Sequence, residues 1–437
     1  MARWSTRGTQ NTVLIGRQAD LTTELTSGLV AIPVTFESDH TQEQEDFSDL
    51  ASGQFGAYEA PAPGSKSGGT VKMKGRIDAL KDGYVPGPLE NPGDTGIIAY
   101  TMAMIANALG SDSATATDNA NFLAGLHMSR NPYDAGDVTG GAVGSIDVTT
   151  DASYKTGSLV YAATDATRSP ATRGLGFVAT RTGAGPFNLA LFESYPTAAA
   201  SGDNAYGTAT GFLSASETWP LTVHHYGDND AFKFAYIGCV ASRLMLDFTS
   251  GKTPTFELDF VYTDRKRYST GGGTSAPADF QSARPFLGRN NGYFTIDGSP
   301  VCGWADVKIE INWAITPIQC PNKAQGVSEF VRLLDTVAVT ATVPLDSGDV
   351  VTANLGPFEL AYESGTTKSL GVSVGAQPGE IVALLLPAMK LASPPKLVDA
   401  NGLLAQELEF RPATYTGDDG SPTATAAADS LLRLAVA

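Results

Sequence analysis

The stretch that most constrains the fold is residues 244–260, where apolar side chains recur at every second position on both sides of a turn. The apolar positions are Leu244, Leu246 and Phe248 before Ser250-Gly251-Lys252, and Phe256, Leu258 and Phe260 after it. A period of two places successive side chains on opposite faces of a strand. The stretch therefore predicts a β-hairpin with an apolar face and a face that carries Asp247, Glu257 and Asp259.

The tripeptide Gly251-Lys252-Thr253 also matches the end of a phosphate-binding P-loop, whose full pattern is Gly-x-x-x-x-Gly-Lys-Ser/Thr between a strand and a helix. Here Leu246 stands at the first glycine position, and Pro254 leads into a second alternating run rather than a helix. Both departures favour a hairpin turn over a nucleotide site.

Short matches in the same order in both halves suggest two copies of one β-rich module. Glu257-Leu258-Asp259-Phe260 resembles Glu407-Leu408-Glu409-Phe410, and both tetrapeptides follow a turn that contains glycine. Two further pairs of matches are residues 70–73 with 336–339, and residues 31–34 with 315–318. The distance from Thr70 to Glu257 far exceeds that from Thr336 to Glu407, so the first copy carries an insert.

These matches divide the chain into a first module at residues 1–266, a linker at residues 267–291 and a second module at residues 292–437. The insert, at about residues 111–215, contains short alternating runs and is expected to form a β-rich subdomain that faces outward. Residues 37–69 form a long polar segment, which is expected to be an arm that becomes ordered against a neighbouring molecule.

One clear helix is predicted in the first module, capped by Asp94 or Thr95 and ended by Gly110. In the second module, Pro357 to Tyr362 predicts at most a short helix. Apart from these segments, the patterns are those of strands and turns, as expected for a chain with 47 glycines.

The charge of the chain argues against binding to DNA, because 46 acidic and 29 basic residues give a formal net charge of -17. Binding to nucleic acid requires basic side chains that displace counterions from phosphates. An acidic surface suits instead a wall past which DNA slides without adhering. The sequence shows no signal peptide or apolar span long enough for a membrane helix, so synthesis in a host cytoplasm is expected.

Few residues suggest catalysis or metal binding. His224 and His225 are neighbours in an alternating run, where they point to opposite faces, and a surface or strand-edge role is favoured over a metal site. His40 and His127 are expected to lie alone in loops. Asp228-Asn229-Asp230 favours a solvated turn over a calcium loop. The cysteines Cys239, Cys302 and Cys320 are too few for a disulfide framework, although a bridge between Cys302 and Cys320 is open. No catalytic residue, metal or cofactor is predicted.

A basic cluster stands out at Asp264-Arg265-Lys266-Arg267. In so acidic a chain it could form salt bridges with carboxylates of a neighbouring subunit, and a solvated linker is the simpler alternative.

The order of these features resembles the tail tube (major tail) proteins of tailed bacteriophages. The features that carry the resemblance are residues 69–75, the helix around Tyr100 to Leu109, residues 237–240 leading into the 244–260 hairpin, residues 292–298, Trp304 to Trp313, and Glu407 to Arg411. The resemblance implies a mainly β protein with two tandem sandwich or barrel modules, each with a flanking helix. It also implies a structural, non-enzymatic role as a virion tail subunit.

In that family, strands of neighbouring subunits join into an inner β-barrel around the DNA conduit, and rings stack into a tube. The resemblance therefore implies rings, with a trimer favoured over a hexamer for a two-module chain. Other implied partners are the tape-measure protein, DNA bound without sequence specificity, and the tail terminator and tip proteins. Lumen-facing candidates, expected to form a mostly acidic wall, are Lys72, Lys74, Asp247, Glu257, Asp259, Glu407 and Glu409. The arm would reach a neighbour through Phe47, Phe55 and Tyr58, and Arg265, Lys266 and Arg267 would form inter-subunit salt bridges.

Other functions compete with this interpretation. The chain could form the tube of a contractile injection particle or decorate a capsid, both of which are self-assembling roles. A glycan-binding or glycan-cleaving β-protein is a third possibility, because the chain contains Trp, Tyr and many carboxylates.

Overall fold

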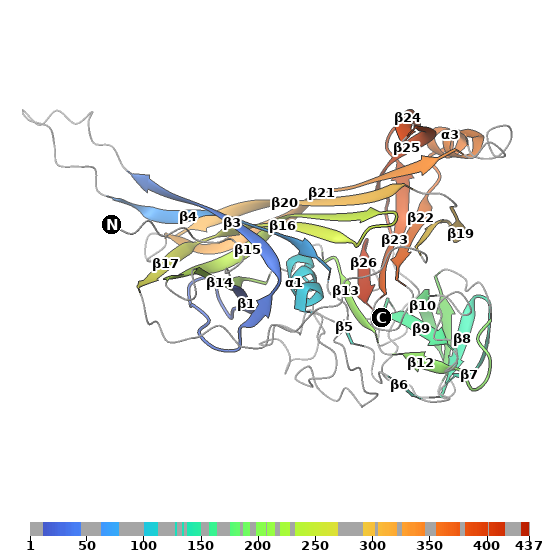
Figure 1. Cartoon of the computed structure of the whole chain (residues 1–437), viewed down its shortest axis with the longest axis horizontal. Helices are drawn as coiled ribbons and strands as arrows, with labels where there is room; N and C mark the ends of the chain where they lie inside the picture. The colour runs from blue at the N-terminus through green and yellow to red at the C-terminus, as the bar shows by residue number, and fades with distance from the viewer. Residues whose placement is uncertain are drawn as a thin grey trace, which may run out of the picture.

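Strands dominate the computed structural model of the chain, and within its described residues they form a sheet of nineteen strands and a sheet of seven (Figure 1). The larger sheet is curved into a half-barrel. The structure describes residues 12–44, 63–77, 100–111, 127–128, 133–134, 138–149, 157–163, 175–183, 187–192, 198–206, 208–214, 219–227, 232–269, 292–301, 305–320, 326–345, 355–375, 381–400, 402–415 and 430–436. No helix within these ranges is long and apolar enough to cross a membrane.

Eight strands lie side by side along the larger sheet and form what we call the central ribbon. Their order is β3, β4, β16, β15, β20, β21, β25 and β24, and every neighbouring pair is antiparallel. Their bounds are β3 Val34–Gln44, β4 Pro63–Arg76, β15 Phe232–Thr249, β16 Thr255–Tyr262, β20 Asp306–Gln319, β21 Val327–Pro344, β24 Lys396–Ala400 and β25 Leu403–Pro412. Strands from both halves of the chain therefore form one continuous surface.

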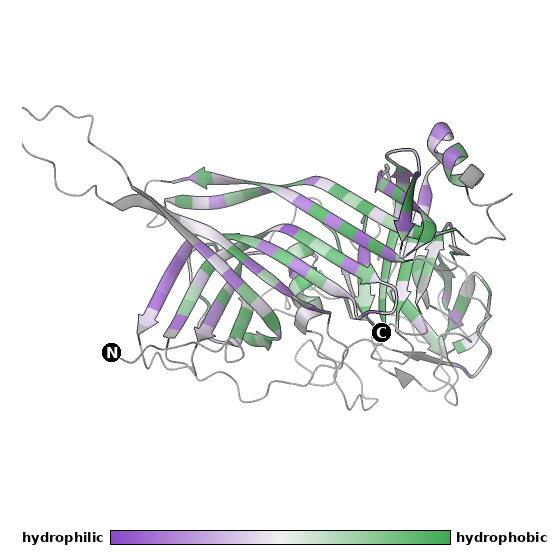
Figure 2. Cartoon of the chain, turned by 45° about the horizontal axis from the view of Figure 1, so that its top comes forward, coloured by the Kyte–Doolittle hydropathy of each residue, from purple (hydrophilic) through white to green (hydrophobic). Residues whose placement is uncertain are grey.

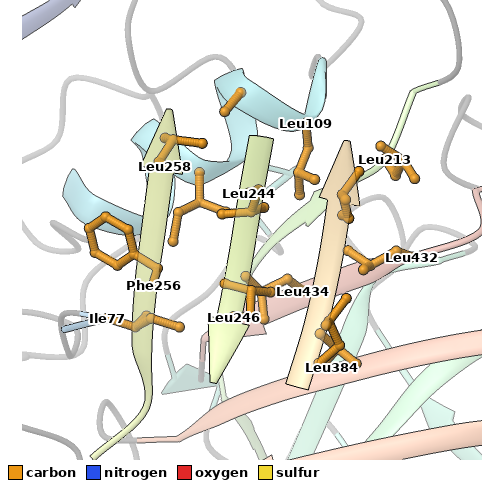
Figure 3. Packing of buried hydrophobic residues seen from close by; sticks show 14 of the residues in the cluster. Ile77, Leu109, Leu213, Leu244, Leu246, Phe256, Leu258, Leu384, Leu432 and Leu434 are labelled. Carbon is orange, nitrogen blue, oxygen red and sulfur yellow. The ribbon is translucent and has the colours of Figure 1, made fainter. Parts of the chain in front are cut away.

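Hydrophilic and hydrophobic residues alternate along these strands, as the bands of colour in Figure 2 show, and this alternation gives the central ribbon one buried face. The buried side chains include Met73, Leu244, Leu246, Leu258, Ile309, Val339 and Leu408, each at most 1% exposed. They belong to the main hydrophobic core, part of which Figure 3 shows. Burial of large aliphatic and aromatic side chains contributes roughly 1.5–3 kcal/mol each.

Helix α1 (Tyr100–Leu109) packs against this buried face. Residues 101–111 are all buried, as expected for a helix that is enclosed by protein on every side. The guanidinium of Arg332, on β21, donates to the carbonyl of Ala108 at the end of the helix. A cation at that position is favoured by the negative end of the helix dipole.

Shorter strands continue the larger sheet beyond the central ribbon. In the first half, β1 (Thr12–Arg17) pairs with β2 (Val30–Ile32) and β14 (Leu221–Gly227), and β15 pairs with β14 and β17 (Asp264–Ser269). In the second half, β18 (Tyr293–Ile296) pairs with β19 (Ser299–Pro300) and β22 (Lys368–Val374). Strand β23 (Val382–Leu391) pairs with β22, β25 and β26 (Arg433–Val436).

The seven-stranded sheet falls within the predicted insert. Its strands are β6 Tyr133–Asp134, β7 Val138–Ala142, β8 Ser145–Val148, β9 Leu159–Ala163, β10 Leu175–Thr182, β11 Phe187–Leu191 and β12 Asn204–Tyr206. A buried cluster of Leu159, Tyr161 and Phe177 with Ile381, Leu385 and Ala435 packs it against β23 and β26. Two other segments of the predicted insert, β5 (His127–Met128) and β13 (Ala209–Phe212), belong to the larger sheet instead, where β13 pairs with β26.

The predicted hairpin is confirmed: β15 and β16 are antiparallel, with Leu244 opposite Leu258 and Leu246 opposite Phe256. Lys252 lies in the exposed turn between them and not at a helix. The first helix ends at Leu109, as predicted, and its proposed caps at Asp94 and Thr95 lie outside the described residues. The repeated motifs at residues 257–260 and 407–410 lie on β16 and β25.

Several expectations were wrong. Helix α3 (Leu355–Ser364) is ten residues long, as α1 is, because Pro357 falls in its first turn, where proline is tolerated. The polar segment at residues 37–69 is not a loop throughout: residues 37–44 and 63–69 pair as the β3–β4 hairpin. The match between residues 31–34 and 315–318 is not equivalent in structure, since the first bridges β2 and β3 and the second lies near the end of β20.

Candidate functional site

The candidate site is the polar face of the central ribbon, which lies opposite its buried face. The register places all seven predicted lumen residues on this face: Lys72 lies opposite Asp259, and Lys74 lies opposite Glu257. Asp247 on β15 lies opposite Lys308 on β20. On the other side of β20, Lys308 lies opposite Thr340 on β21, and Thr340 in turn lies opposite Glu409 on β25. Glu407 lies opposite Thr342, two residues further along β21. Cross-strand pairing thus brings together side chains that are up to 337 positions apart in sequence (409 minus 72).

Glu257 is the centre of an ion-pair cluster on the first-half strands. Its carboxylate pairs with Lys72, lies 3.8 Å from the Nζ of Lys74, and lies 3.5 Å from Nη1 of Arg243. Its side chain is only 10% exposed. The hydrogen bond from Lys72 lowers the pKa of Glu257 and, reciprocally, raises the pKa of Lys72. The predicted acidic face is therefore neutralised locally by adjacent lysines.

Arg243 links this cluster across the boundary between the two halves. Its Nε donates to Oε1 of Glu310 at 2.8 Å, and its Nη1 lies 3.7 Å from Oδ2 of Asp259. Burial raises the pKa of Asp259, against the opposing effect of Lys72 and Arg243. Arg243 and Glu310 were absent from the predicted set, because the sequence does not reveal that β15 pairs with β20.

A second set of pairs lies on the second-half strands. Lys396 on β24 lies 3.4 Å from Oε1 of Glu409 and 3.8 Å from Oε1 of Glu407. A hydrogen bond from Ser393 is the main cause of the lowered pKa of Glu409. Lys308 pairs with Asp306 at 3.0 Å, which raises the pKa of Lys308. Cations and carboxylates therefore alternate over the polar face of both halves.

The chemistry of this face is that of a polar sheet surface on which opposite charges are paired. Exposed ion pairs contribute little to stability, about 0–1 kcal/mol each, but they keep a large sheet surface hydrophilic. Among the residues that the structure describes, no group of three or more His, Cys, Asp or Glu side chains is arranged to hold a metal ion. Cys239 is a buried free thiol, Cys320 is also free, and Cys302 lies outside the described residues.

The two margins of the central ribbon form the second part of the site. Within the described chain, β3 pairs only with β4, and β24 pairs only with β25. Each margin therefore presents a row of backbone groups that another strand can complete.

The predicted contact residues outside the central ribbon have varied positions. Arg265, Lys266 and Arg267 lie on strand β17 rather than in a solvated linker. Lys266 already has a partner within the chain, since its Nζ lies 3.2 Å from Oε2 of Glu24, and Arg265 lies over the ring of Phe234. The inter-subunit role of the three residues stays a prediction. Phe47, Phe55 and Tyr58 lie outside the described residues.

The histidine assignments were also wrong in part. His224 is fully buried and its Nε2 lies 3.1 Å from Oε1 of Glu24, so it is not a surface residue. The ring of His225 packs against that of Phe36, with the two ring centroids 4.5 Å apart. His40 and His127 lie on strands β3 and β5, not in loops.

Comparison with known families identifies the family of the chain. Residues 128–412, more than half of the 437 residues, match the family described as phage tail tube protein. A search of curated proteins finds no match. Members of the matched family are structural, non-enzymatic components that assemble into the tube of the virion tail. The chain belongs to the phage tail tube protein family and is a structural component of the virion.

Proposed function

We propose that three copies of the chain close laterally into a ring whose inner wall is one continuous barrel built from their central ribbons. The polar face lines the conduit for DNA, and rings stack to form the tail tube. The observation that carries the proposal is the ribbon itself, which is eight strands wide, polar on one face and unpaired at both margins within the described chain.

The order of pairings supports two tandem modules in each chain. Along the first half, β3, β4 and α1 are followed, after the intervening strands β5 to β13, by β14, β15 and β16. Along the second half, β20, β21 and α3 are followed by β22, then by β23 and β24 at the place of β15, and then by β25. The lateral order repeats as well, as β3-β4-β16-β15 and then β20-β21-β25-β24. Val71 lies opposite Phe260 just as Val339 lies opposite Phe410. This pairing makes Val71 equivalent to Val339, whereas the sequence match of Thr70 with Thr336 paired Val71 with Val337. The two alignments differ by two residues, so equivalent side chains still lie on the same face of the sheet.

We assign the modules to residues 1–266 and 292–437, joined by residues 267–291, the first three of which form the end of strand β17. The insert at about residues 111–215 would then decorate the outside of the ring. Its packing against β23 and β26, away from the polar face of the ribbon, is consistent with that position.

Barrel geometry favours three copies over six. Three copies supply 24 strands, from 3 × 8, and at a spacing of about 4.8 Å and a tilt of about 40° they enclose a barrel roughly 50 Å across between backbones. Inward side chains of about 5 Å on each side would leave a bore of roughly 40 Å. A DNA duplex, whose grooves are each about 8 Å deep and whose width is roughly 20 Å, passes through such a bore. Six copies would give a barrel about twice as wide, which would confine DNA poorly.

The paired charges of the polar face suit passage of DNA. Lys72, Lys74, Arg243, Lys308 and Lys396 each lie within 3.8 Å of a carboxylate. Phosphates would have to displace those carboxylates to bind, so DNA and the tape-measure protein could move through without adhering. The same rings would end at the tail terminator and tip proteins.

The proposal is tested by assembling the purified chain, determining the mass of its rings by native mass spectrometry, and imaging its tubes by cryo-electron microscopy. We expect a ring of three chains with 24 strands in the inner wall. A ring of six chains, or a chain that remains single under all conditions, would refute it.

The direction of the polar face is tested separately by labelling. Thr340→Cys places a thiol on the polar face, and Val143→Cys places one in the turn between β7 and β8, where Val143 is 49% exposed. A maleimide on a polymer wider than the bore should label the Val143→Cys thiol in tubes and the Thr340→Cys thiol only in dissociated protein. The unsubstituted chain controls for the native cysteines. Equal labelling of both sites in tubes would contradict an inward polar face.

A further inference from the structure

We propose a specific register for the joint between neighbouring copies: β24 of one copy pairs antiparallel with β3 of the next, with Lys396 opposite Asp39. The inference rests on the proposed ring and adds to it the identity of the contacting residues. Its source is the junction between β15 and β20, where the two halves of one chain already meet.

The internal junction serves as a template because its strands have equivalents at the two margins. Met245 on β15 lies opposite Glu257 of the first tetrapeptide, and Lys396 on β24 lies opposite Glu407 of the second. Glu257 and Glu407 are the first residues of the repeated tetrapeptides at residues 257–260 and 407–410. Their strand partners are therefore equivalent, so Lys396 in the second module corresponds to Met245 in the first.

The other margin is aligned in the same way. Ser38 on β3 lies opposite Val71, and Ile309 on β20 lies opposite Val339. Val71 and Val339 are equivalent because each lies opposite the phenylalanine of its tetrapeptide. Ser38 in the first module therefore corresponds to Ile309 in the second, and Asp39 corresponds to Glu310.

The template then fixes the register between copies. Within one chain, Met245 lies opposite Glu310, Leu246 opposite Ile309, and Thr249 opposite Asp306. The corresponding pairs between copies are Lys396 with Asp39, Leu397 with Ser38, and Ala400 with Thr35. Pro395, which has no N–H to donate, lies at the end of this ladder, so the joint is five residues long.

Two features of the margins support this register independently of the alignment. Lys396 and Asp39 have opposite charges and would face each other on the polar side, where such cross-strand pairs are favourable. Leu397 is 58% exposed in the single chain, whereas Leu246, whose place it takes, is fully buried beside β20. A neighbouring β3 would cover Leu397 with Ser38 and the adjacent Phe36, which removes an exposed leucine from a free edge.

Disulfide trapping tests the register. Thr35 and Ala400 would lie directly opposite each other, within the reach that a disulfide requires. We expect rings of the Thr35→Cys/Ala400→Cys variant to form covalent dimers and closed trimers on oxidation. The matched control is Thr35→Cys/Val398→Cys, which moves one thiol two residues along the same face, and the cross-linked fraction should be at least about tenfold lower there.

The two single variants, Thr35→Cys and Ala400→Cys, report any cross-linking through the native cysteines. Suppose that rings of normal mass form and that Thr35→Cys/Val398→Cys cross-links but Thr35→Cys/Ala400→Cys does not. That result would overturn the register, while the proposed ring would stand. Absence of rings in the unsubstituted chain would instead overturn the proposed function. Because Thr35 is exposed and Ala400 is half-buried on an edge strand, both changes are compatible with folding of the chain.

Discussion

Glu24 is the centre of a buried polar cluster outside the polar face of the central ribbon. Its side chain is 5% exposed and accepts hydrogen bonds from Tyr268 and Lys266, while Lys233 lies 3.7 Å away and His224 lies 3.1 Å away. Burial acts to raise the pKa of the Glu24 carboxyl, but these hydrogen bonds and His224 outweigh it, and the pKa is lowered. One carboxylate thus joins the loop after β1 to β14, β15 and β17.

Replacing Glu24 by Gln should destabilise the fold strongly. The change leaves the ammonium of Lys233, only 10% exposed, without its counter-charge, and breaking a buried pair costs about 3–5 kcal/mol. Urea unfolding of the dissociated chain would measure the loss. The control is Lys266→Ala, since Lys266 is 46% exposed and its pair should contribute less than about 1 kcal/mol. Equal losses in the two variants would show that burial of the cluster is unimportant.

His224 should make the fold sensitive to acid. Burial lowers its pKa from 6.5 to about 4, with Lys233 acting in the same direction. The unfolded chain therefore binds a proton between about pH 6.5 and pH 4 that the folded chain does not, so stability falls as the pH falls through this window. A shift of this size corresponds to roughly 3 kcal/mol.

Urea midpoints at pH 7 and pH 4.5 would reveal this effect. We expect His224→Gln to have a smaller difference between the two midpoints than the unsubstituted chain, because it removes the titrating group. If both proteins lose the same stability on acidification, the effect arises from other groups. The sequence could not predict this behaviour, because the buried partner of His224 is 200 positions away.

At the scale of elements, strand β15 connects two parts of the larger sheet. Its first part pairs with β14 and β17, and its second part pairs with β16 and β20. The change of partners occurs around Gly238, which has a φ of 67° and lies at a register shift against β14. Its N–H donates to Oε1 of Gln18 at 2.7 Å. The bulge bends the strand so that one element serves both parts of the sheet.

Gly238→Ala should therefore be much more harmful than Gly251→Ala. Both glycines have a positive φ, which costs an alanine about 1–2 kcal/mol. At Gly238 the new Cβ would also lie 2.5 Å from the carbonyl oxygen of Leu21, whereas at Gly251 no atom lies within 4 Å. Thermal unfolding should show a loss of at least about 3 kcal/mol for the first variant and about 1 kcal/mol for the second. Similar losses would mean that the loop at Leu21 moves aside freely.

The sequence could predict local structure, such as the β15–β16 hairpin, but not the pairing of strands that are far apart in the chain. Alternation and a glycine turn are local signals, so the β15–β16 hairpin and the shared face of Glu257 and Asp259 could be predicted from residues 244–260. The partners across the sheet depend on non-local pairing, so Arg243 and Glu310 were missed. Helix α3 was underestimated because its exposed face carries Leu360, 65% exposed, and its pattern is weakly amphipathic.

At the scale of the whole molecule, the two tandem modules that we propose would allow assembly by repetition. The junction of β15 with β20 joins two halves within a chain, and the same kind of junction would join β24 to β3 between chains. A closed ring then leaves no lateral edge of the ribbon unpaired, which is how barrels avoid uncontrolled edge-to-edge aggregation. The sequence matches suggested a repeat, but the lateral order of the strands, on which the proposed equivalence of the margins rests, required the structure.

Assembly should be promoted by salt, because each copy has a formal net charge of -17 and a ring of three would bring -51 together (3 × 17). The proposed joint consists of a short backbone ladder, a covered leucine and one exposed ion pair, whose own contribution is at most about 1 kcal/mol. Repulsion between whole copies should therefore dominate the response to ionic strength. The screening length falls from about 30 Å at 0.01 M salt to about 8 Å at 0.15 M, which is short relative to the size of a subunit.

Sedimentation velocity at these two salt concentrations would measure the effect, and we expect the fraction of ring to rise with salt. Asp39→Asn provides the control, because it removes the proposed ion pair and one negative charge. That variant should still assemble more fully at the higher salt concentration, since repulsion between copies remains. Rings that dissociate as salt is added, and do so less in Asp39→Asn, would mean that ion pairs rather than the backbone ladder and covered apolar surface hold the copies together.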